Sequence, residues 1–234
     1  MSPSAARLRQ NLAILRAQIA AAAARSGRRA EDIRLVGVTK YVGPPLARLL
    51  AEEGLLDLGE SRPQALWEKA AALSDLDVRW HLIGHLQRNK IRRSLPLITL
   101  VHSGDSLRLL ESLDEESRAL GRSVDVLLEV NISGDAAKLG FAPNELAAAL
   151  PRAASLGSIS IRGLMAMAAL EGGEDRARRD FAALRELRDR LAGDCPPTIE
   201  RGELSMGMSG DFVIAIEEGA TIVRIGSGLF ENIQ

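Results

Sequence analysis

Short apolar runs alternate with longer amphipathic stretches along the chain. The apolar runs are four to eight residues long and are bounded by glycine, proline or polar residues, as strands commonly are. They comprise residues 33–39, 56–59, 78–83, 98–102, 124–131, 159–165, 203–206 and 221–225. Between them, apolar residues such as Leu110, Leu113 and Leu120 recur at helical spacing, and charges occupy the other faces. The pattern predicts an α/β protein made of βα units around a parallel sheet.

The number of strands favours one architecture within this class. Eight parallel strands are the number that closes a (β/α)8 TIM barrel, and 234 residues suit a single barrel domain spanning 1–234. An open, doubly wound sheet would show the same alternation, so this alternative stays open at the level of sequence.

The first 26 residues carry an additional helical pattern ahead of the first strand. The apolar positions that recur there are Leu8, Leu12, Leu15 and Ile19. They predict an extra amphipathic helix over 1–26 that packs on the barrel. Residues 1–30 contain several arginines and no acidic residue, a composition that organellar transit peptides share, so a targeting segment is the alternative interpretation.

Composition and charge argue against several classes of function. The chain is 46% hydrophobic and 26% charged, which is typical of a folded domain with one large core. Its 30 basic and 31 acidic residues give a net charge of -1, so no overall field attracts nucleic acid or an anionic membrane. The single cysteine, Cys195, cannot form an internal disulfide and is expected in an ordinary loop. No apolar stretch is long enough to span a bilayer, and we expect a cytoplasmic protein.

Chemistry in a (β/α)8 barrel lies where the strands end, and polar or glycine residues follow several of the predicted strands. They are Lys40, Glu60, His102-Ser103, Asn131, Ser209, Arg224 and Gly226-Ser227-Gly228. Lys40 follows the apolar run 35–38, so partial desolvation is expected to lower its pKa and supply the neutral amine that a Schiff base needs. The alternative is that Lys40 begins a loop and points into water.

The segment after the eighth predicted strand is suited to an anion. Gly226, Ser227 and Gly228 leave backbone N–H groups accessible, and Ser209, after the seventh strand, adds a hydroxyl. Barrels frequently bind phosphate in the loops after strands seven and eight, so a phosphate site is predicted here. The alternative is a glycine turn chosen only for its tight geometry.

Two other groups of polar residues are interpreted as structural. His81 and His85 are four residues apart, but no nearby cysteine or carboxylate completes a ligand set, so we expect no metal. The basic cluster 88–93 is expected to be a solvated helix face, because the protein as a whole is near neutral.

Taken together, segments along nearly the whole chain resemble the pyridoxal 5′-phosphate (PLP) homeostasis protein family. These are single-barrel relatives of fold-type III PLP enzymes such as alanine racemase. The segments are VGVTK ending at Lys40, LGESRPQ at 58–64, WHLIGHLQRNK at 80–90, VHSGDSLRL at 101–109, EVNISGDAAKLGF at 129–141, IRGLMAM at 161–167 and LSMGMSGDFVIAIEEGATIVRIGSGLF at 204–230.

The resemblance implies a role for each candidate residue. Lys40 would hold PLP as a Schiff base, Ser209 and the Gly226-Ser227 backbone would hold its phosphate, and Arg224 would lie beside the pyridine nitrogen. Because arginine cannot accept a proton, the ring would stay unprotonated and act as a weaker electron sink. Two residues depart from the family pattern, which usually has asparagine where this chain has Ser61 and threonine where it has Tyr41.

The resemblance implies a protein that stores or delivers PLP, with PLP-dependent apoenzymes as partners, and not an enzyme. We expect a monomer. A fold-type III amino-acid racemase or decarboxylase is the alternative, but alanine racemase uses a second β domain, and this sequence stops four residues after Phe230. A Schiff-base aldolase acting on phosphorylated sugars is a third reading, in which Lys40 attacks the substrate directly.

Overall fold

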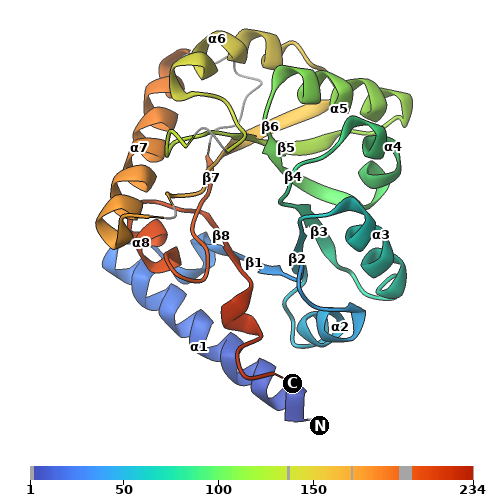
Figure 1. Ribbon diagram of the computed structural model, residues 1–234, viewed down its shortest axis with the longest axis vertical. Coiled ribbons are helices and arrows are strands. Elements are labelled where there is room, and N and C mark those ends of the chain that lie inside the picture. Colours follow the sequence, from blue (N-terminus) through green and yellow to red (C-terminus); the bar gives the residue numbers. More distant parts are fainter. Residues whose placement is uncertain (1–2, 136–137, 170, 195–201, 234) are drawn as a thin grey trace.

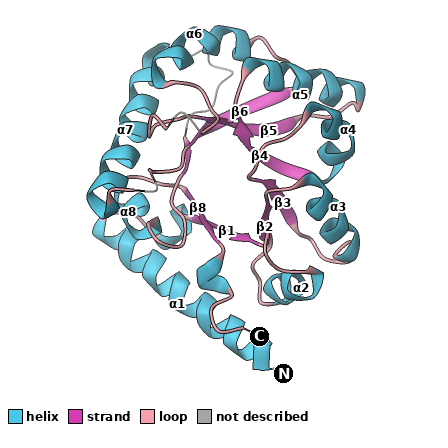
Figure 2. Ribbon diagram, viewed as in Figure 1, coloured by secondary structure: helices cyan, strands magenta, loops and turns pink. Residues whose placement is uncertain are grey.

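Eight parallel strands form a closed barrel in which each strand pairs with its neighbours in chain order (Figure 1 and Figure 2). The computed structural model describes residues 3–135, 138–169, 171–194 and 202–233, so Cys195 lies outside the described residues. The strands are β1 (Arg34–Val38), β2 (Asp57–Glu60), β3 (Arg79–Leu82), β4 (Ile98–Gly104), β5 (Val124–Glu129), β6 (Ile159–Met165), β7 (Glu203–Ser205) and β8 (Ile222–Ile225). Because β8 also pairs with β1, the prediction of a TIM barrel is confirmed and the open sheet is ruled out.

The observed strands agree closely with the eight predicted ones, and their ends differ by at most two residues. The largest differences are in β4 and β5. β4 continues to Gly104, where a Cβ would lie 2.7 Å from the carbonyl oxygen of Leu127, so glycine allows the two strands to approach. β5 ends at Glu129, because Val130 instead forms an isolated bridge with Phe141.

Helices surround the barrel on its outside (Figure 2). They are α2 (Pro44–Glu52), α3 (Pro63–Ala72), α4 (Ile91–Ser94), α5 (Leu107–Ala119), α6 (Pro143–Ala154), α7 (Gly173–Asp194) and α8 (Phe212–Glu217). Proline begins α2, α3 and α6, where its fixed φ suits a first helical turn and its missing N–H costs nothing. The basic cluster 88–93 covers a short 3-10 helix (Arg88–Lys90) and the start of α4, and its arginines are exposed as expected.

An additional helix, α1 (Pro3–Arg25), lies outside the barrel against α8 and the end of the chain (Figure 1). All four residues of the predicted apolar stripe are buried: Leu8, Leu12, Leu15 and Ile19. Asn11 is also buried, and its Nδ2 donates to the carbonyl oxygens of Leu229 at 3.1 Å and Glu231 at 2.9 Å. The prediction of an extra N-terminal helix is therefore confirmed, with the helix observed over Pro3–Arg25. Among the described residues, none of the helices has the length and apolar character needed to cross a membrane.

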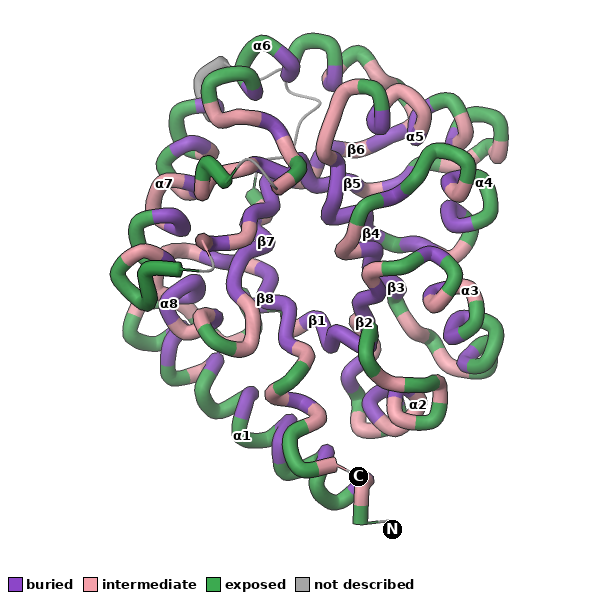
Figure 3. Tube along the Cα trace, viewed as in Figure 1, coloured by how far each residue is buried: buried purple, intermediate pink, exposed green. Residues whose placement is uncertain are grey.

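The strands are buried around the whole ring (Figure 3). Side chains alternate between the two faces of a strand, so residues two apart share a face. A small apolar cluster, separate from the main core, consists of Val36, Leu100, Leu127, Met165 and Ile222. Leu100 is followed two residues later by His102, and Ile222 by Arg224. These two polar side chains therefore lie on the same face of their strands as this cluster, one step closer to the C-terminal end of the barrel.

Candidate functional site

A pocket of about 350 Å³ opens where the strands end, and we call it the rim pocket. Its lining comes from the ends of β1, β2, β3, β6, β7 and β8: Val38, Lys40, Tyr41, Ser61, Ile83, Met167, Met208, Ser209, Gly210, Arg224, Gly226 and Ser227. The structure thus brings together the five residues to which the resemblance gave a role in holding PLP, although they span almost 190 positions of the chain: Lys40, Ser209, Arg224, Gly226 and Ser227. Ser61 and Tyr41, the two departures from the family pattern, line the same pocket.

Lys40 lies in the turn directly after β1 and is exposed at the mouth of the rim pocket. The expectation that it is partly desolvated was therefore wrong. The apolar run before it is buried, but the chain leaves the barrel wall at Thr39. Its Nζ lies 4.9 Å from the centre of the Tyr41 ring, which is itself 89% exposed. Tyr41 thus provides a cation–π partner that keeps the amine near the pocket opening.

A buried ion pair fixes the residue that precedes Lys40. The Nζ of Lys69, on α3, donates to the Thr39 carbonyl oxygen at 2.7 Å and to the Glu60 carboxylate. The Thr39 hydroxyl donates to the same carboxylate at 2.6 Å, and both charged side chains are almost completely buried. Lys40 therefore projects from a backbone position that is held on two sides.

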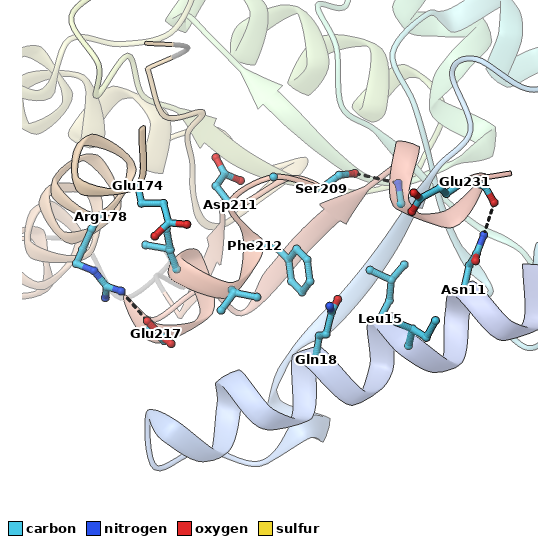
Figure 4. Close-up of a pocket in the computed structure, with 15 residues that line it drawn as sticks. Asn11, Leu15, Gln18, Glu174, Arg178, Ser209, Asp211, Phe212, Glu217 and Glu231 are labelled. Atoms are coloured by element: carbon cyan, nitrogen blue, oxygen red, sulfur yellow. Dashed lines mark hydrogen bonds and ion pairs between the residues drawn. The ribbon is translucent and has the colours of Figure 1, made fainter. Parts of the chain in front are cut away.

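The loop after β7 places Ser209 against the end of β8 (Figure 4). The backbone N–H groups of Gly226 and Gly228 donate to its Oγ at 3.3 Å and 3.4 Å. Gly207 permits the turn: its φ is +93°, and a Cβ would lie 2.5 Å from the Cβ of Ala215. Backbone N–H groups and a hydroxyl thus meet at one corner of the pocket, an arrangement suited to an anion.

Arg224 is buried at the inner end of the rim pocket. Its Nη1 donates to Ser205 Oγ at 2.5 Å, and its Nη2 donates to the Ala166 carbonyl oxygen at 3.1 Å. Burial lowers the pKa of the guanidinium to about 10, and the carboxylates of Glu129 and Asp211 oppose this shift. The group is therefore still charged at neutral pH, and it can only donate hydrogen bonds.

Glu129, at the inward-facing end of β5, is a titratable group that the sequence did not single out. Burial raises its pKa to about 7; the nearby Asp105 also raises it, and Arg224 and His85 lower it. Only its position near the end of a predicted strand, two residues before Asn131, could have indicated it.

The two histidines considered for a metal do not act together. His85 is exposed, and its Nδ1 lies 2.8 Å from the Asp105 carboxylate, whereas His81 is buried in the barrel and contacts Asp57 and His102. His102, expected at the rim, is also inside the barrel, because β4 continues past it. The described part of the chain contains no cluster of His, Cys, Asp or Glu that could hold a metal ion.

A larger pocket of about 620 Å³ lies between α1 and α8 and shares Ser209 with the rim pocket (Figure 4). Its acidic side chains are Glu174, Asp211, Glu217 and Glu231, and its basic residue Arg178 is paired with Glu217 at 2.7 Å. These carboxylates make the larger pocket unsuitable for a phosphate, so the rim pocket is the better candidate site.

The chain matches a family described as "Alanine racemase, N-terminal domain" over residues 6–232. It is 40% identical over 214 residues to the pyridoxal phosphate homeostasis protein of Aquifex aeolicus, covering 91% of this chain and 92% of the relative. The protein of that name from Pseudomonas aeruginosa is 38% identical over 221 residues, covering 94% of each chain. This chain belongs to the pyridoxal phosphate homeostasis protein family. The resemblance inferred from the sequence is thereby confirmed.

Solved structures of other proteins share the barrel fold. PipY of Synechococcus elongatus, in its structure with PLP bound, is 36% identical and superposes with a TM-score of 0.86, covering 95% of this chain and 99% of that one. An alanine racemase of Clostridium difficile superposes with a TM-score of 0.73 at 18% identity, and this chain covers 55% of its length. The racemase likeness shows the barrel fold alone.

Proposed function

We propose that this protein binds PLP in the rim pocket and takes part in PLP homeostasis, storing or delivering the cofactor through a Schiff base on Lys40. The proposal rests on the meeting, in one pocket, of an exposed amine, an anion-binding corner and a buried guanidinium. These groups complement the aldehyde, the phosphate and the ring nitrogen of PLP. It is also supported by the names of the relatives and by the PLP bound to PipY.

The chemical character of each group fits its proposed partner. Lys40 offers the amine. The Ser209 oxygen accepts from the Gly226 N–H, which leaves the hydroxyl proton for the phosphate, and the backbone of Gly226 and Ser227 lines the same corner of the pocket. Arg224 offers a donor to the ring nitrogen. The pocket volume of about 350 Å³ lies within the range of roughly 300–1,000 Å³ typical of small-molecule sites.

The proposal includes the absence of turnover by the protein itself. Bound PLP supplies an electron sink for reactions at the carbon atoms of an attached amine. Arg224 weakens this sink because, as a charged donor, it disfavours a proton on the ring nitrogen. The exposure of Lys40 also leaves the reacting end open to water, which weakens electrostatic catalysis.

The proposal has three further parts. The protein transfers PLP to PLP-dependent apoenzymes, it is a monomer, and it is located in the cytoplasm. The open position of Lys40 supports transfer, because an acceptor could reach the linkage from outside the barrel. Measuring the activation of a PLP-free apoenzyme by the loaded protein, with free PLP trapped, would test delivery directly. Light scattering would test the oligomeric state.

The decisive experiment is to load the purified protein with PLP, reduce it with borohydride and map the modified peptide by mass spectrometry. We expect a phosphopyridoxyl group on Lys40. Lys90→Ala is the matched control, because Lys90 lies on the basic cluster beside Trp67, away from the rim pocket. A modification on Lys90 or any other lysine, with Lys40 free, would contradict the assignment.

A further inference from the structure

Five side chains cross the barrel interior and connect its N-terminal end with the rim pocket; we call them the interior chain. They are Asp57, His81, His102, Ser205 and Arg224. The Oδ1 of Asp57 lies 3.0 Å from His81 Nε2, and His81 Nδ1 lies 2.9 Å from His102 Nε2. His102 Nδ1 lies 2.8 Å from Ser205 Oγ, which accepts a hydrogen bond from Arg224 Nη1 at 2.5 Å.

The interior chain is almost completely shielded from water. His81, His102 and Ser205 are at most 1% exposed, and Arg224 is 5% exposed. Only Asp57, at the start of β2, approaches the surface, where Arg79 forms a two-point ion pair with its carboxylate. Buried polar atoms in such a position must satisfy each other, because no solvent is available to replace a missing partner.

The two ends of the interior chain determine the direction of every hydrogen bond in it. A guanidinium can only donate and an ionised carboxylate can only accept. With both rings neutral, Asp57 accepts from Nε2 of His81, whose Nδ1 must then accept from Nε2 of His102. Nδ1 of His102 must in turn accept from the Ser205 hydroxyl, whose oxygen accepts from Arg224. Each neutral histidine is thus held in its Nε2–H tautomer.

This arrangement requires that neither histidine be protonated, since a second N–H would place two donors opposite each other. Burial lowers the pKa of both rings. For His81, the carboxylate of Asp57 opposes this shift, while Arg34 and Arg79 add to it. For His102, the charges of Arg224 and Arg34 and the neighbouring His81 add to it. Asp57 is suited to the accepting end, because hydrogen bonds from His81 and Arg79 overcome its burial and hold its pKa well below the usual range.

We infer that the interior chain is a positioning device for the site. It fixes the Arg224 guanidinium in one orientation before any ligand arrives, and His102 and Ser205 are positioning residues that act through it. The ligand class that follows is an aromatic ring carrying an unprotonated, hydrogen-bond-accepting nitrogen. The inference rests on the proposed function only in taking PLP as that ligand.

The first test uses nitrogen NMR on the ligand-free protein, which has three histidines. His81 and His102 should remain neutral Nε2–H tautomers between about pH 5.5 and 8, where an ordinary histidine titrates. The exposed His85 provides the internal comparison, because its ring lies outside the interior chain. An Nδ1–H tautomer or an imidazolium at His102 would overturn the proposed direction of the hydrogen bonds.

The second test removes one hydroxyl with Ser205→Ala and compares it with Ser103→Ala. Ser103 is a matched control because it is equally buried and donates one hydrogen bond, to the Gly84 carbonyl oxygen at 2.7 Å, outside the interior chain. In Ser205→Ala, the His102 resonances should shift and the Arg224 guanidinium should rotate faster by NMR. PLP should bind about 2- to 10-fold more weakly, because binding must then also order the long Arg224 side chain. The absorption spectrum of bound PLP should change as well.

The two readouts separate this inference from the proposed function. If the wild-type protein binds no PLP, the proposed function fails, while the histidine tautomers and the Arg224 rotation in the ligand-free protein still decide the positioning role. If Ser205→Ala leaves Arg224 as rigid as in the wild type, or if Ser103→Ala mobilises it equally, the positioning role is wrong. A lower melting temperature with unchanged Arg224 motion and an unchanged PLP spectrum would likewise reduce Ser205 to a purely structural residue.

Discussion

Replacing Lys69 by methionine tests how strongly the buried ion pair supports the start of the site. The substitution keeps the apolar stem but removes the ammonium group. Among the described residues, the Thr39 hydroxyl at 2.6 Å is then the remaining hydrogen-bond donor to the fully buried Glu60 carboxylate. Removing one partner of a buried pair typically costs about 3–5 kcal/mol, because the other charge stays buried without compensation. We expect a loss of that size in the free energy of unfolding.

Urea denaturation followed by circular dichroism measures this loss. With a slope of about 2–3 kcal/mol per molar, the midpoint should fall by roughly 1–2.5 M urea. The double variant Glu60→Gln with Lys69→Met should recover part of the loss, because it leaves no unpaired charge. Glu53→Gln is the control: it breaks the pair with Arg9, whose side chain is 58% exposed, and should shift the midpoint far less.

A cost below about 1 kcal/mol for Lys69→Met would refute the reasoning, since it would place the pair in the range of exposed salt bridges. Because Lys69 also donates to the Thr39 carbonyl oxygen, the variant should loosen the turn that carries Lys40. PLP should then dissociate faster than from the Glu53→Gln control.

Four further outcomes follow from the site. Lys40→Ala should abolish the visible absorption band of bound PLP without changing the circular dichroism spectrum, because an exposed turn residue contributes little to the core. Arg224→Gln should keep phosphate binding but alter the spectrum of bound PLP or its pH dependence; loss of inorganic phosphate binding alone would place Arg224 at the anion instead. Folding raises the pKa of Glu129 from 4.5 to about 7 and so favours the protonated carboxyl, and the free energy of unfolding of the ligand-free protein should therefore fall by on the order of 3 kcal/mol as pH rises from 4.5 to 7. Glu129→Gln should remove this pH dependence. Mixed with D- or L-alanine, the loaded protein should racemise or decarboxylate little faster than free PLP; turnover on the order of 1 s⁻¹ that vanishes in Lys40→Ala would establish an enzyme.

Periodicity and position along the chain were sufficient to predict the elements and the candidate residues. Burial of a strand or a helix face is a local property that repeats every two or every three to four residues, so it is visible in a single sequence. The barrel rule then placed Lys40, Ser209 and Gly226 near one another, because strand ends of a closed parallel sheet share one rim. The structure brings these residues to one pocket.

The contacts that hold the site depended on the tertiary structure. Lys69 was not among the residues singled out from the sequence, yet closure of the sheet places α3 so that its ammonium reaches Thr39, 30 positions earlier. His102 and Ser205 are 103 positions apart and meet only because β4 and β7 face each other across the barrel interior. The exposure of Lys40 was likewise decided by where the chain leaves the barrel wall. Such pairings depend on strand register and on the barrel closing, which no local pattern in the sequence encodes.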